Sequence, residues 1–579
     1  MGVFKYIPLL EWIKSYDKQD LRGDLSAGLT VGVMLIPQGM AYAMLAGMPP
    51  IYGLYASTIP LILYAIFGTS RQLAVGPVAM VALLVANGVG QIADTGSDRF
   101  IALAILLALM VGVIQLALGV FRLGFLVNFL SHPVISGFTS AAALIIGLSQ
   151  LKHLLGLDIP RSNFVHEIII NAFQKLDQIH LPTVILGLGG IAVILLVKRF
   201  NKAIPGPLVA VVLSTLAVYL LNLHTRGLKI VQEVPEGFPG LTVPAVSGDD
   251  ISLLLPTALT IALVGFMESF AVAKAIQAKH KNYEVKADQE LIGLGVANIV
   301  GSLFKSFPTT GGFSRTAVND QAGARTGMAS IISAVLIILT LLFLTPLFYY
   351  LPKAILASII MVAVFGLIDF KEAVHLWKAD RRDFYMLIAT FLATLTLGIE
   401  EGIAIGVVLS LGMVIYRATY PHIAVLGKVP GTKQYRNIYR FPDAQERPEI
   451  LIVRFDAQLF FANIGFFRDK LQKLEDDHGT PVKLLVLNAE AINGLDSSAV
   501  GVLYDLVDDY RARGVDIYFS GVKGPIRDIM FKSGLTQKIG ETNFFMHTEH
   551  AVSHFDKIKN HQSTEVSEYA LQTNVPLKS

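Results

Sequence analysis

The sequence predicts an all-α, multi-pass membrane domain followed by a small α/β domain. Hydrophobic residues make up 53% of its 579 residues and charged residues only 16%, whereas soluble globular proteins contain roughly 25% charged residues. The mean hydropathy is +0.58. Nearly all long apolar runs lie between residues 25 and 417. We therefore expect a short cytoplasmic segment at 1–24, a transmembrane domain at 25–417, a cytoplasmic domain at 418–560 and a disordered tail at 561–579.

Fourteen apolar segments are candidates for the membrane domain, because a helix needs about 20 apolar residues to cross a bilayer, with a range of about 17–25. They are expected near 25–45, 50–67, 77–90, 100–120, 126–150, 181–198, 204–222, 251–274, 288–302, 314–325, 328–348, 352–368, 383–398 and 400–417. The third and the tenth are too short to cross as single helices. Each follows an extended stretch that contains Gly and Pro, Gln72–Pro77 and Phe307–Gly312.

The two short segments occupy the third position in each group of seven. Because seven is odd, the second group enters from the opposite side of the membrane, which predicts an inverted repeat. Short or Gly/Pro-broken segments at matching positions indicate the midplane binding site of a transporter. In the alternative interpretation, Gly and Pro only kink ordinary membrane helices.

The distribution of Lys and Arg predicts that both termini are cytoplasmic. The cytoplasmic side would hold Lys14, Lys18, Arg22, Arg71, Arg122, Lys198, Arg199, Lys202, Lys279, Lys281, Lys286, Lys371, Lys378, Arg381 and Arg382. The opposite loops hold mainly acidic residues, including Glu233, Glu236, Asp249, Asp250, Glu400 and Glu401. We expect a multi-pass protein of a cell membrane, most simply a bacterial inner membrane, with no removable signal peptide. Residues 162–179 are periodic but charged, which predicts an amphipathic surface helix.

The soluble part alternates strands and helices. Strands are expected at 450–455, 483–488 and 515–519, and helices at 465–474, 497–513 and 525–532. This alternation predicts one small domain with a parallel-type sheet. We expect the end of the chain, 562–579, to be disordered.

Composition also excludes several function classes. The net charge of +3 is too small to indicate a nucleic-acid partner. The absence of cysteine excludes disulfides and thiolate metal sites. The soluble part has no P-loop, metal cluster or catalytic-triad spacing, so we expect no enzyme, no metal and no cofactor.

The starts of the two short segments are candidates for an anion site. The first turn of a helix presents free N–H groups and the positive end of the helix dipole, and two such ends can bind an anion together. They are expected to begin at Pro77 and Ser314. A first-turn proline loses no hydrogen bond, and Ser314 would cap its helix or donate its hydroxyl to a ligand.

Two ionisable residues lie inside apolar segments, where they are costly and usually functional. Arg315 would attract an anion, or it would pair structurally with Glu268 or with a carbonyl. Glu268 would take up and release a proton that is coupled to anion entry, or it would be a static partner of Arg315. The spacing of Gln38 and Tyr42 places both on one helix face, where they would bind a small oxyanion. In the alternative interpretation, Gln38 only bridges helices.

These segments together resemble the sulfate permease (SulP, solute carrier 26) family. The motifs are Pro37–Tyr55 (PQGMAYAMLAGMPPIYGLY), Ser70–Ala79 (SRQLAVGPVA), Gly265–Lys274 (GFMESFAVAK) and Asn298–Ser302 (NIVGS). The resemblance implies a homodimer in which a core domain moves like an elevator against a gate domain, on a plan shared with nucleobase transporters. It places the anion near the residues that match Gln38, Tyr42, Val78, Ala79, Gly312, Phe313, Ser314 and Arg315.

The soluble part resembles the STAS domain of the same family, through Asn493–Val500 (NGLDSSAV). In related antagonists of anti-sigma factors a serine at this turn is phosphorylated, which makes Ser497 and Ser498 candidate phosphosites and suggests a cytoplasmic protein partner. The alternative is ordinary capping chemistry, in which Asp496 caps the helix that starts near Ser497.

The resemblance also ranks the possible substrates. The motifs are most similar to those of plant and bacterial sulfate carriers, and Glu268 resembles the proton-coupled members. We therefore expect uptake of sulfate with H⁺. Symport of bicarbonate with Na⁺ comes second, and an anion exchanger or channel is the other alternative.

Overall fold

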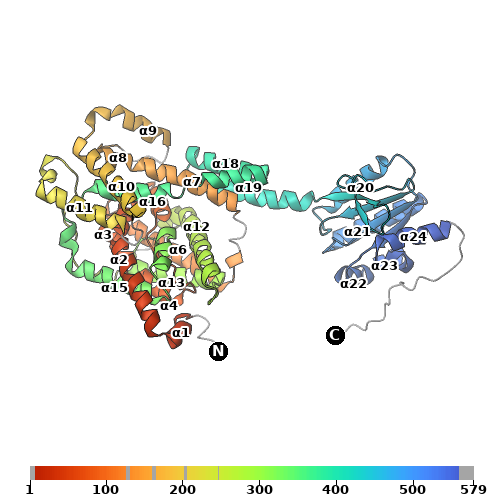
Figure 1. Ribbon diagram of the computed structural model, residues 1–579, viewed down its shortest axis with the longest axis horizontal. Helices are drawn as coiled ribbons and strands as arrows, with labels where there is room; N and C mark the ends of the chain where they lie inside the picture. The colour runs from red at the N-terminus through yellow and green to blue at the C-terminus, as the bar shows by residue number, and fades with distance from the viewer. Residues whose placement is uncertain (1–6, 126–130, 160–164, 201–204, 245–246, 560–579) are drawn as a thin grey trace. The chain divides into compact units, whose positions relative to one another are not determined.

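The computed structural model describes residues 7–125, 131–159, 165–200, 205–244 and 247–559. The chain divides into two compact units, Met1–Ser410 and Leu411–Ser579. The first unit is almost entirely helical, and the second contains a six-stranded sheet with helices. Figure 1 shows both units, coloured along the chain.

Helices account for every predicted membrane segment, within the described ranges. They are α2 (Lys18–Ala46), α3 (Ile51–Tyr55), α4 (Ile59–Phe67), α5 (Ala79–Gly90), α6 (Asp98–Val120), α7 (His132–Ser149), α8 (Leu151–Leu155), α10 (Leu181–Phe200), α11 (Gly206–Leu220), α12 (Gly248–His280), α13 (Ala287–Leu303), α14 (Phe313–Gln321), α15 (Met328–Phe343), α16 (Lys353–Phe365), α18 (Arg381–Thr396) and α19 (Ile399–Thr419). Seven of the described helical segments are long and apolar enough to cross a membrane.

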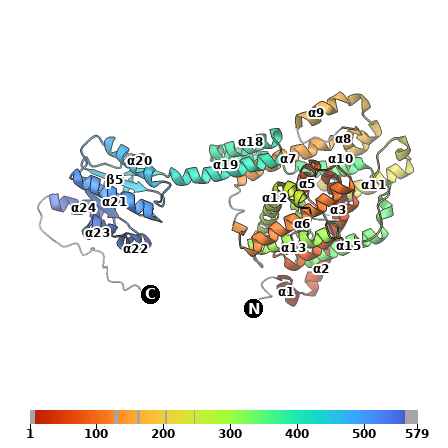
Figure 2. The same ribbon diagram turned by 180° about the vertical axis from the view of Figure 1, so that it is seen from behind.

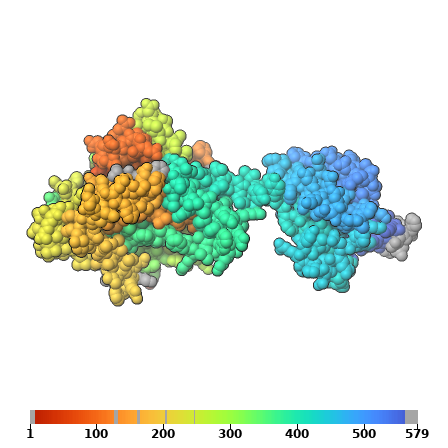
Figure 3. Space-filling model, turned by 90° about the horizontal axis from the view of Figure 1, so that it is seen from above, coloured from red at the N-terminus to blue at the C-terminus, as the bar shows by residue number. Residues whose placement is uncertain are grey.

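Short helices supplement the membrane segments. They are α1 (Leu9–Trp12), α9 (Val165–Gln174) and α17 (Phe370–Ala379). The amphipathic helix predicted at 162–179 corresponds to α9, whereas α17 was not predicted. Figure 2 places α5, α6 and α12 close together and α9 at the periphery. Figure 3 shows the orange and yellow segments that include α9 and α10 at the surface of this unit.

Several boundaries differ from the prediction for local reasons. Helix α2 begins at Lys18 because Asp17 caps it, accepting from the backbone N–H of Asp20 in a reciprocal capping box. The predicted second segment is broken into α3 and α4. Pro60 lies in the first turn of α4, where a proline is tolerated although it could not continue a preceding helix.

The two extended stretches pair with each other. Strand β1 (Val75–Gly76) and strand β2 (Thr310–Gly311) are antiparallel, with Val75 opposite Gly311 and Gly76 opposite Thr310. Antiparallel pairing is the arrangement that two oppositely inserted repeats produce. Each strand leads into one of the short helices, α5 or α14.

Buried hydrogen bonds hold these strands in the helical unit. The side chain of Asn298 on α13 donates to the carbonyl of Thr309 at 3.0 Å and accepts from the N–H of Thr309 at 2.8 Å. The hydroxyl of Ser269 on α12 accepts from the N–H of Gly311 at 2.7 Å. Since β2 is too short to be stable alone, these bonds fix the start of α14.

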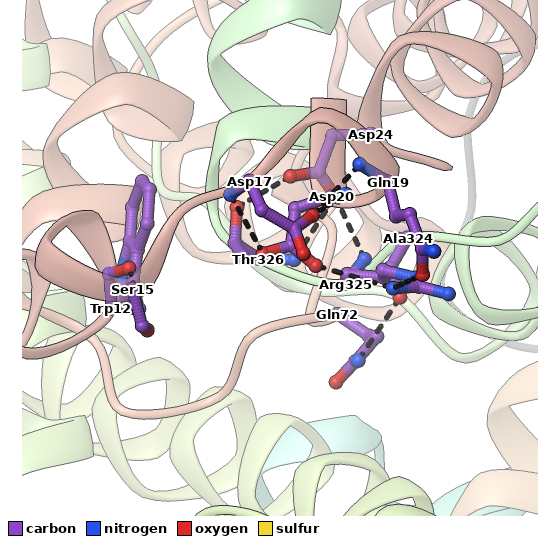
Figure 4. Close-up of polar contacts among 10 residues, drawn as sticks. All are labelled: Trp12, Ser15, Asp17, Gln19, Asp20, Asp24, Gln72, Ala324, Arg325 and Thr326. Atoms are coloured by element: carbon purple, nitrogen blue, oxygen red, sulfur yellow. Dashed lines mark hydrogen bonds and ion pairs between the residues drawn. The ribbon is translucent and has the colours of Figure 1, made fainter. Parts of the chain in front are cut away.

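A buried carboxylate connects α2 to the segment that follows α14. Asp24 is fully buried and accepts from the backbone N–H of Arg325 at 2.7 Å and of Thr326 at 3.0 Å. It also accepts from the Thr326 hydroxyl at 2.5 Å, and Gln72 donates to the carbonyl of Ala324 at 3.1 Å. Figure 4 shows these contacts. They set the position of α2 relative to α14, the two helices that carry most of the predicted polar site residues.

The second unit has the strand order β4-β3-β5-β6-β7-β8. Its elements are β3 (Ile423–Lys428), β4 (Tyr435–Asn437), β5 (Ile450–Phe455), α20 (Ile464–Asp476), β6 (Leu484–Asn488), α21 (Ser497–Ala512), β7 (Asp516–Ser520), α22 (Gly524–Lys532), α23 (Leu535–Ile539), β8 (Phe544–Phe545) and α24 (Thr548–Lys559). All three predicted strands and all three predicted helices are present.

The sheet is mixed, so the prediction of a parallel-type sheet was incomplete. Strands β5 to β8 are parallel, while β3 pairs antiparallel with both β4 and β5. Strands β3 and β4 form a hairpin at the sheet edge and need no crossover helix, so the alternation of strands and helices did not reveal them. The tail predicted to be disordered lies outside the described residues.

Candidate anion-binding site

The predicted site residues from four separate helices line one cavity of about 620 Å³. They are Gln38, Tyr42, Val78, Ala79, Glu268, Gly312, Phe313, Ser314 and Arg315. The opposite wall comes from α10, α11 and α16, through residues such as Ile194, Gly206 and Ile359. The tertiary structure therefore collects residues that lie up to 277 positions apart in the sequence.

The starts of α5 and α14 are the framework of the site. The residues before their first turns are Val78 and Gly312, both in extended conformation and both without a side-chain cap. Neither residue has a side-chain oxygen that could accept from the first-turn N–H groups. Those groups have no intrahelical acceptor, so they are available to a ligand, together with the positive ends of both helix dipoles.

Two predicted details at these helix starts were wrong. Helix α5 begins at Ala79 and not at Pro77, because the chain remains extended through Val78. Helix α14 begins at Phe313, so Ser314 lies inside the first turn and does not cap the helix. Phe313 and Ser314 are both exposed and line the cavity, which leaves the Ser314 hydroxyl available as a donor to a ligand.

Arg315 is 1% exposed and reaches from α14 to the chain that follows β1. One of its terminal nitrogens donates to the carbonyl of Pro77. Its Nε and its other terminal nitrogen have no hydrogen-bond partner among the described residues. The carbonyl contact agrees with one of the structural alternatives, but it uses only part of the guanidinium. Arginine stays charged even when buried, so a positive group with unpaired donors borders the cavity.

Glu268 lies on α12 and lines the same cavity. One of its carboxylate oxygens is buried without a hydrogen-bond partner in the described part of the chain. No ion pair within 4.0 Å joins Glu268 to Arg315 in the described residues. Whether Glu268 carries a proton or is a static partner of Arg315 stays a prediction for experiment.

Gln38 and Tyr42 share one face of α2 and are nearly fully buried, as their spacing predicted. The side-chain oxygen of Gln38 has no partner among the described atoms. Gly312 brings the chain close to Arg315, since a Cβ at this position would lie 2.9 Å from its terminal nitrogen. A larger residue at 312 would push the guanidinium out of place.

The sequence analysis missed the residues that line the wider part of the cavity. Met34 and Met80 add apolar surface near the site, and Lys198 and Gln321 line the cavity at the ends of α10 and α14. Their spacing carried no signal, because a methionine in an apolar helix or a lysine at its end is ordinary in membrane proteins. Only the packing of α10 against the site assigns Lys198 to the cavity.

The candidate phosphosites lie at a capped helix start in the second unit. Asp496 accepts from the N–H of Ala499 at 2.8 Å, which confirms that it caps α21. It also accepts from the N–H of Phe461 at 2.8 Å. Ser497 and Ser498 are exposed in the first turn of α21. Both hydroxyls are thus accessible, and the capping itself is performed by Asp496.

The fold and the cavity define a membrane protein of the inverted-repeat class, whose candidate site lies at the starts of two half-helices. A separate α/β domain follows the membrane domain. The profile of the sulfate permease family matches residues 21–390, and that of the STAS domain matches residues 441–551. The chain belongs to the sulfate permease family.

The sequences of two plant relatives align with almost the whole chain. "Sulfate transporter 4.1, chloroplastic" of Arabidopsis thaliana is 43% identical, over 94% of this chain and 82% of that protein. "High affinity sulfate transporter 2" of Stylosanthes hamata is 34% identical, over 96% of this chain and 87% of that protein.

Solved structures share the fold. The structure of murine Slc26a9 in the inward-facing state has a TM-score of 0.88 and 29% identity, covering 96% of this chain and 94% of that one. The transmembrane domain of the cyanobacterial bicarbonate transporter BicA has a TM-score of 0.60 and 24% identity, covering 69% of this chain and 99% of that one. The latter likeness concerns the fold alone.

Proposed function

We propose that the protein is a secondary active transporter of small inorganic anions that takes up sulfate together with protons. The observation that carries this proposal is the buried guanidinium of Arg315 between the free starts of α5 and α14. Two helix N-termini and an arginine with unpaired N–H groups suit a compact oxyanion. The names of the plant relatives, at 43% and 34% identity, support sulfate as the oxyanion.

Glu268 is the proposed proton carrier. It faces the same cavity as Arg315, and one of its oxygens lacks a partner. An intramembrane carboxylate in such a position commonly belongs to a proton relay. Protonation of Glu268 would remove a negative charge from the cavity and so favour entry of an anion. Coupling follows because the anion and the proton stabilise each other in the same cavity.

The geometry also supports alternating access by an elevator-like movement. The cavity reaches Gln321 at the end of α14, where Lys279 of α12 contacts Asp320 at 3.3 Å. On the same helix α12, Thr257 lies 11 residues before Glu268, on the other side of the site. Its hydroxyl donates to Glu400 of α19 at 2.7 Å. We propose that this bond closes the outer side while the cavity is open to the cytoplasm. The core domain that carries α5, α12 and α14 must break the bond to move.

Several further properties belong to the same proposal. Both termini are cytoplasmic, because the basic residues gather on one side of the membrane. The protein forms a homodimer in a cell membrane. The exposed hydroxyls of Ser497 and Ser498 are sites for phosphorylation or for a cytoplasmic partner, since a phosphate there would meet the N-terminus of α21.

The deciding experiment is uptake of radiolabelled sulfate by the purified protein in liposomes. We expect accumulation with an inward H⁺ gradient and none with an inward Na⁺ gradient or without a gradient. Accumulation driven by Na⁺ and competed by bicarbonate would replace the proposal with Na⁺/bicarbonate symport. Gradient-independent equilibration would instead indicate an exchanger or a channel.

The proton role of Glu268 has its own test. Glu268→Gln keeps the size of the side chain but cannot ionise, so it should abolish H⁺-driven accumulation and spare sulfate/sulfate exchange. The matched control is Glu401→Gln, the same chemical change at a residue outside the cavity lining. Accumulation that survives in Glu268→Gln would contradict the proton role while leaving anion transport itself intact.

A further inference from the structure

The short helix α17 presents three chemically different faces. It connects α16 to α18 and was not anticipated from the sequence. At about 100° per residue, its ten residues divide into a buried face, an exposed apolar face and an exposed basic face. Figure 3 shows the blue-green segments of this part of the chain at the surface of the helical unit.

The buried face attaches α17 to the rest of the unit. Leu376 is 7% exposed. Glu372 lies on the same face and pairs with His132 at the start of α7, at 3.2 Å. Asp369 caps the helix by accepting from the N–H of Glu372 at 3.0 Å. The orientation of α17 on the protein is therefore defined, and its other faces point away from the protein.

The apolar face is largely uncovered in the described part of the chain, and only its Trp377 edge packs against a neighbouring ring, that of Phe384 on α18, at 5.0 Å between ring centres. Phe370, Val374 and Trp377 are spaced at i, i+4 and i+7, and they are 76%, 55% and 45% exposed. Large apolar side chains that gather on one exposed face mark a membrane or protein contact. The helix connects α16 to α18 of the membrane domain, and its charged residues set it apart from these apolar neighbours, so we assign this face to the bilayer surface.

The basic face lies directly beside the apolar one. Lys371 and Lys378 are exposed, one and eight positions after Phe370, which places them about 90° from the apolar stripe. Arg381 follows at the start of α18, with its guanidinium 5.1 Å from the centre of the Trp377 ring. An apolar stripe with an interfacial tryptophan and a basic border is the arrangement of helices that lie in the headgroup layer.

We propose that α17 binds anionic phospholipid headgroups, with Phe370, Val374 and Trp377 inserted among the acyl chains and Lys371, Lys378 and Arg381 on the phosphates. Charge complementarity favours lipid over a second copy of the chain. Two copies that met through this face would bring their basic borders together, and like charges at short range repel.

A juxtamembrane lysine contributes about a fivefold preference for an anionic surface. Gly366 and Leu367, just before α17, line the cavity, so lipid bound to α17 would lie close in sequence to a segment of the cavity wall.

The sequence provides a direct reporter, because Trp377 is one of only two tryptophans. Trp12→Phe leaves Trp377 as the single tryptophan, which is excited selectively at wavelengths that the tyrosines do not absorb. The full-length protein is reconstituted in vesicles that contain increasing mole fractions of either brominated phosphatidylglycerol or brominated phosphatidylcholine. We expect both lipids to quench Trp377, and the anionic lipid to quench at a severalfold lower mole fraction. Lys371→Gln/Lys378→Gln should remove most of this difference in potency, with Arg381 as the remaining cation.

The control variant is Lys281→Gln/Lys286→Gln, which removes the same charge from exposed lysines elsewhere. It should keep the preference for anionic lipid. Equal quenching by both lipids in the parent protein, or an equal loss of preference in the control variant, would overturn the proposal. So would a Trp377 that neither lipid quenches.

A contact with a second copy is tested separately. Since the chain has no native cysteine, Val374→Cys introduces a single thiol on the apolar face. Efficient disulfide-linked dimers under mild oxidation would assign the face to a second copy and overturn the lipid proposal. A Val374→Cys protein that forms no disulfide-linked dimer, and whose thiol reacts with a lipid-soluble reagent, would support the lipid proposal.

Discussion

Replacement of Arg315 by glutamine should weaken anion binding without unfolding the protein. Arg315 is 1% exposed, and two of its nitrogens have no partner among the described residues. Glutamine keeps an amide N–H that can donate to the carbonyl of Pro77, so the local structure should survive. The positive charge and the remaining donors are lost.

The magnitude follows from those unpaired donors. A hydrogen bond that involves a charged group contributes about 1.5–3 kcal/mol. The loss of one such net interaction with a sulfate oxygen, at about 2–3 kcal/mol, raises the Kd roughly 30- to 150-fold. The effect should be similar for other oxyanions, because the guanidinium recognises charge and geometry and not the central atom.

The assay is equilibrium binding of radiolabelled sulfate to purified protein in detergent, which needs no gradient and is independent of coupling. Arg325→Gln is the matched control, because Arg325 is half-exposed and contacts Asp20 at 3.4 Å outside the cavity. Its Kd should stay within about twofold of the parent value, since surface ion pairs contribute little. A Kd within threefold of the parent for Arg315→Gln would refute the binding role and make the arginine structural.

Three further substitutions test the scaffold. Asp24→Asn weakens the bonds to the chain after α14, at a cost of about 2 kcal/mol of stability. The apparent Tm in detergent should therefore fall by about 5 °C, and an unchanged Tm would contradict the bridging role of Asp24. Gly53→Ala places a Cβ 1.9 Å from the carbonyl oxygen of Gly39, so it should cost about 3 kcal/mol or prevent folding, as measured by monodisperse yield. Thr257→Val removes the bond to Glu400, which contributes about 1 kcal/mol to the inward-open state. The ratio of outward-open to inward-open protein without ligand should therefore rise about fivefold. Slower thiol labelling of a cysteine at Met34 in the cavity would report that shift, and an unchanged rate would argue against it.

The spans and the position of the site were predictable because the signals are local. A run of about 20 apolar residues suffices to identify a membrane helix, and the shortness of the third and tenth segments can be read directly from the sequence. The Gly- and Pro-containing stretches before them predicted extended chain, and β1 and β2 are extended. The site residues predicted at the starts of the two short helices, Val78, Ala79, Gly312, Phe313, Ser314 and Arg315, all line the cavity. Their roles in binding and coupling remain predictions.

Local signals also explain the errors. Pro77 is compatible with a helix start, but the extended conformation continues through Val78. Ser314 is a good capping residue in isolation, yet α14 begins one residue earlier. Helix α17 has an i, i+4, i+7 apolar stripe that the sequence contained. It escaped prediction because its charges interrupt the apolar run that identifies a span.

The sequence alone thus predicted the order of the membrane segments and the two short segments at matching positions, since each depends on local composition and spacing, and the family resemblance added most of the residues that line the cavity. The tertiary structure decided what those residues contact. The pairing of β1 with β2, the bond from Arg315 to the carbonyl of Pro77, and the bonds from Asp24 to the chain beyond α14 join residues more than 230 positions apart. Such contacts depend on how the helices pack, and no local pattern encodes them.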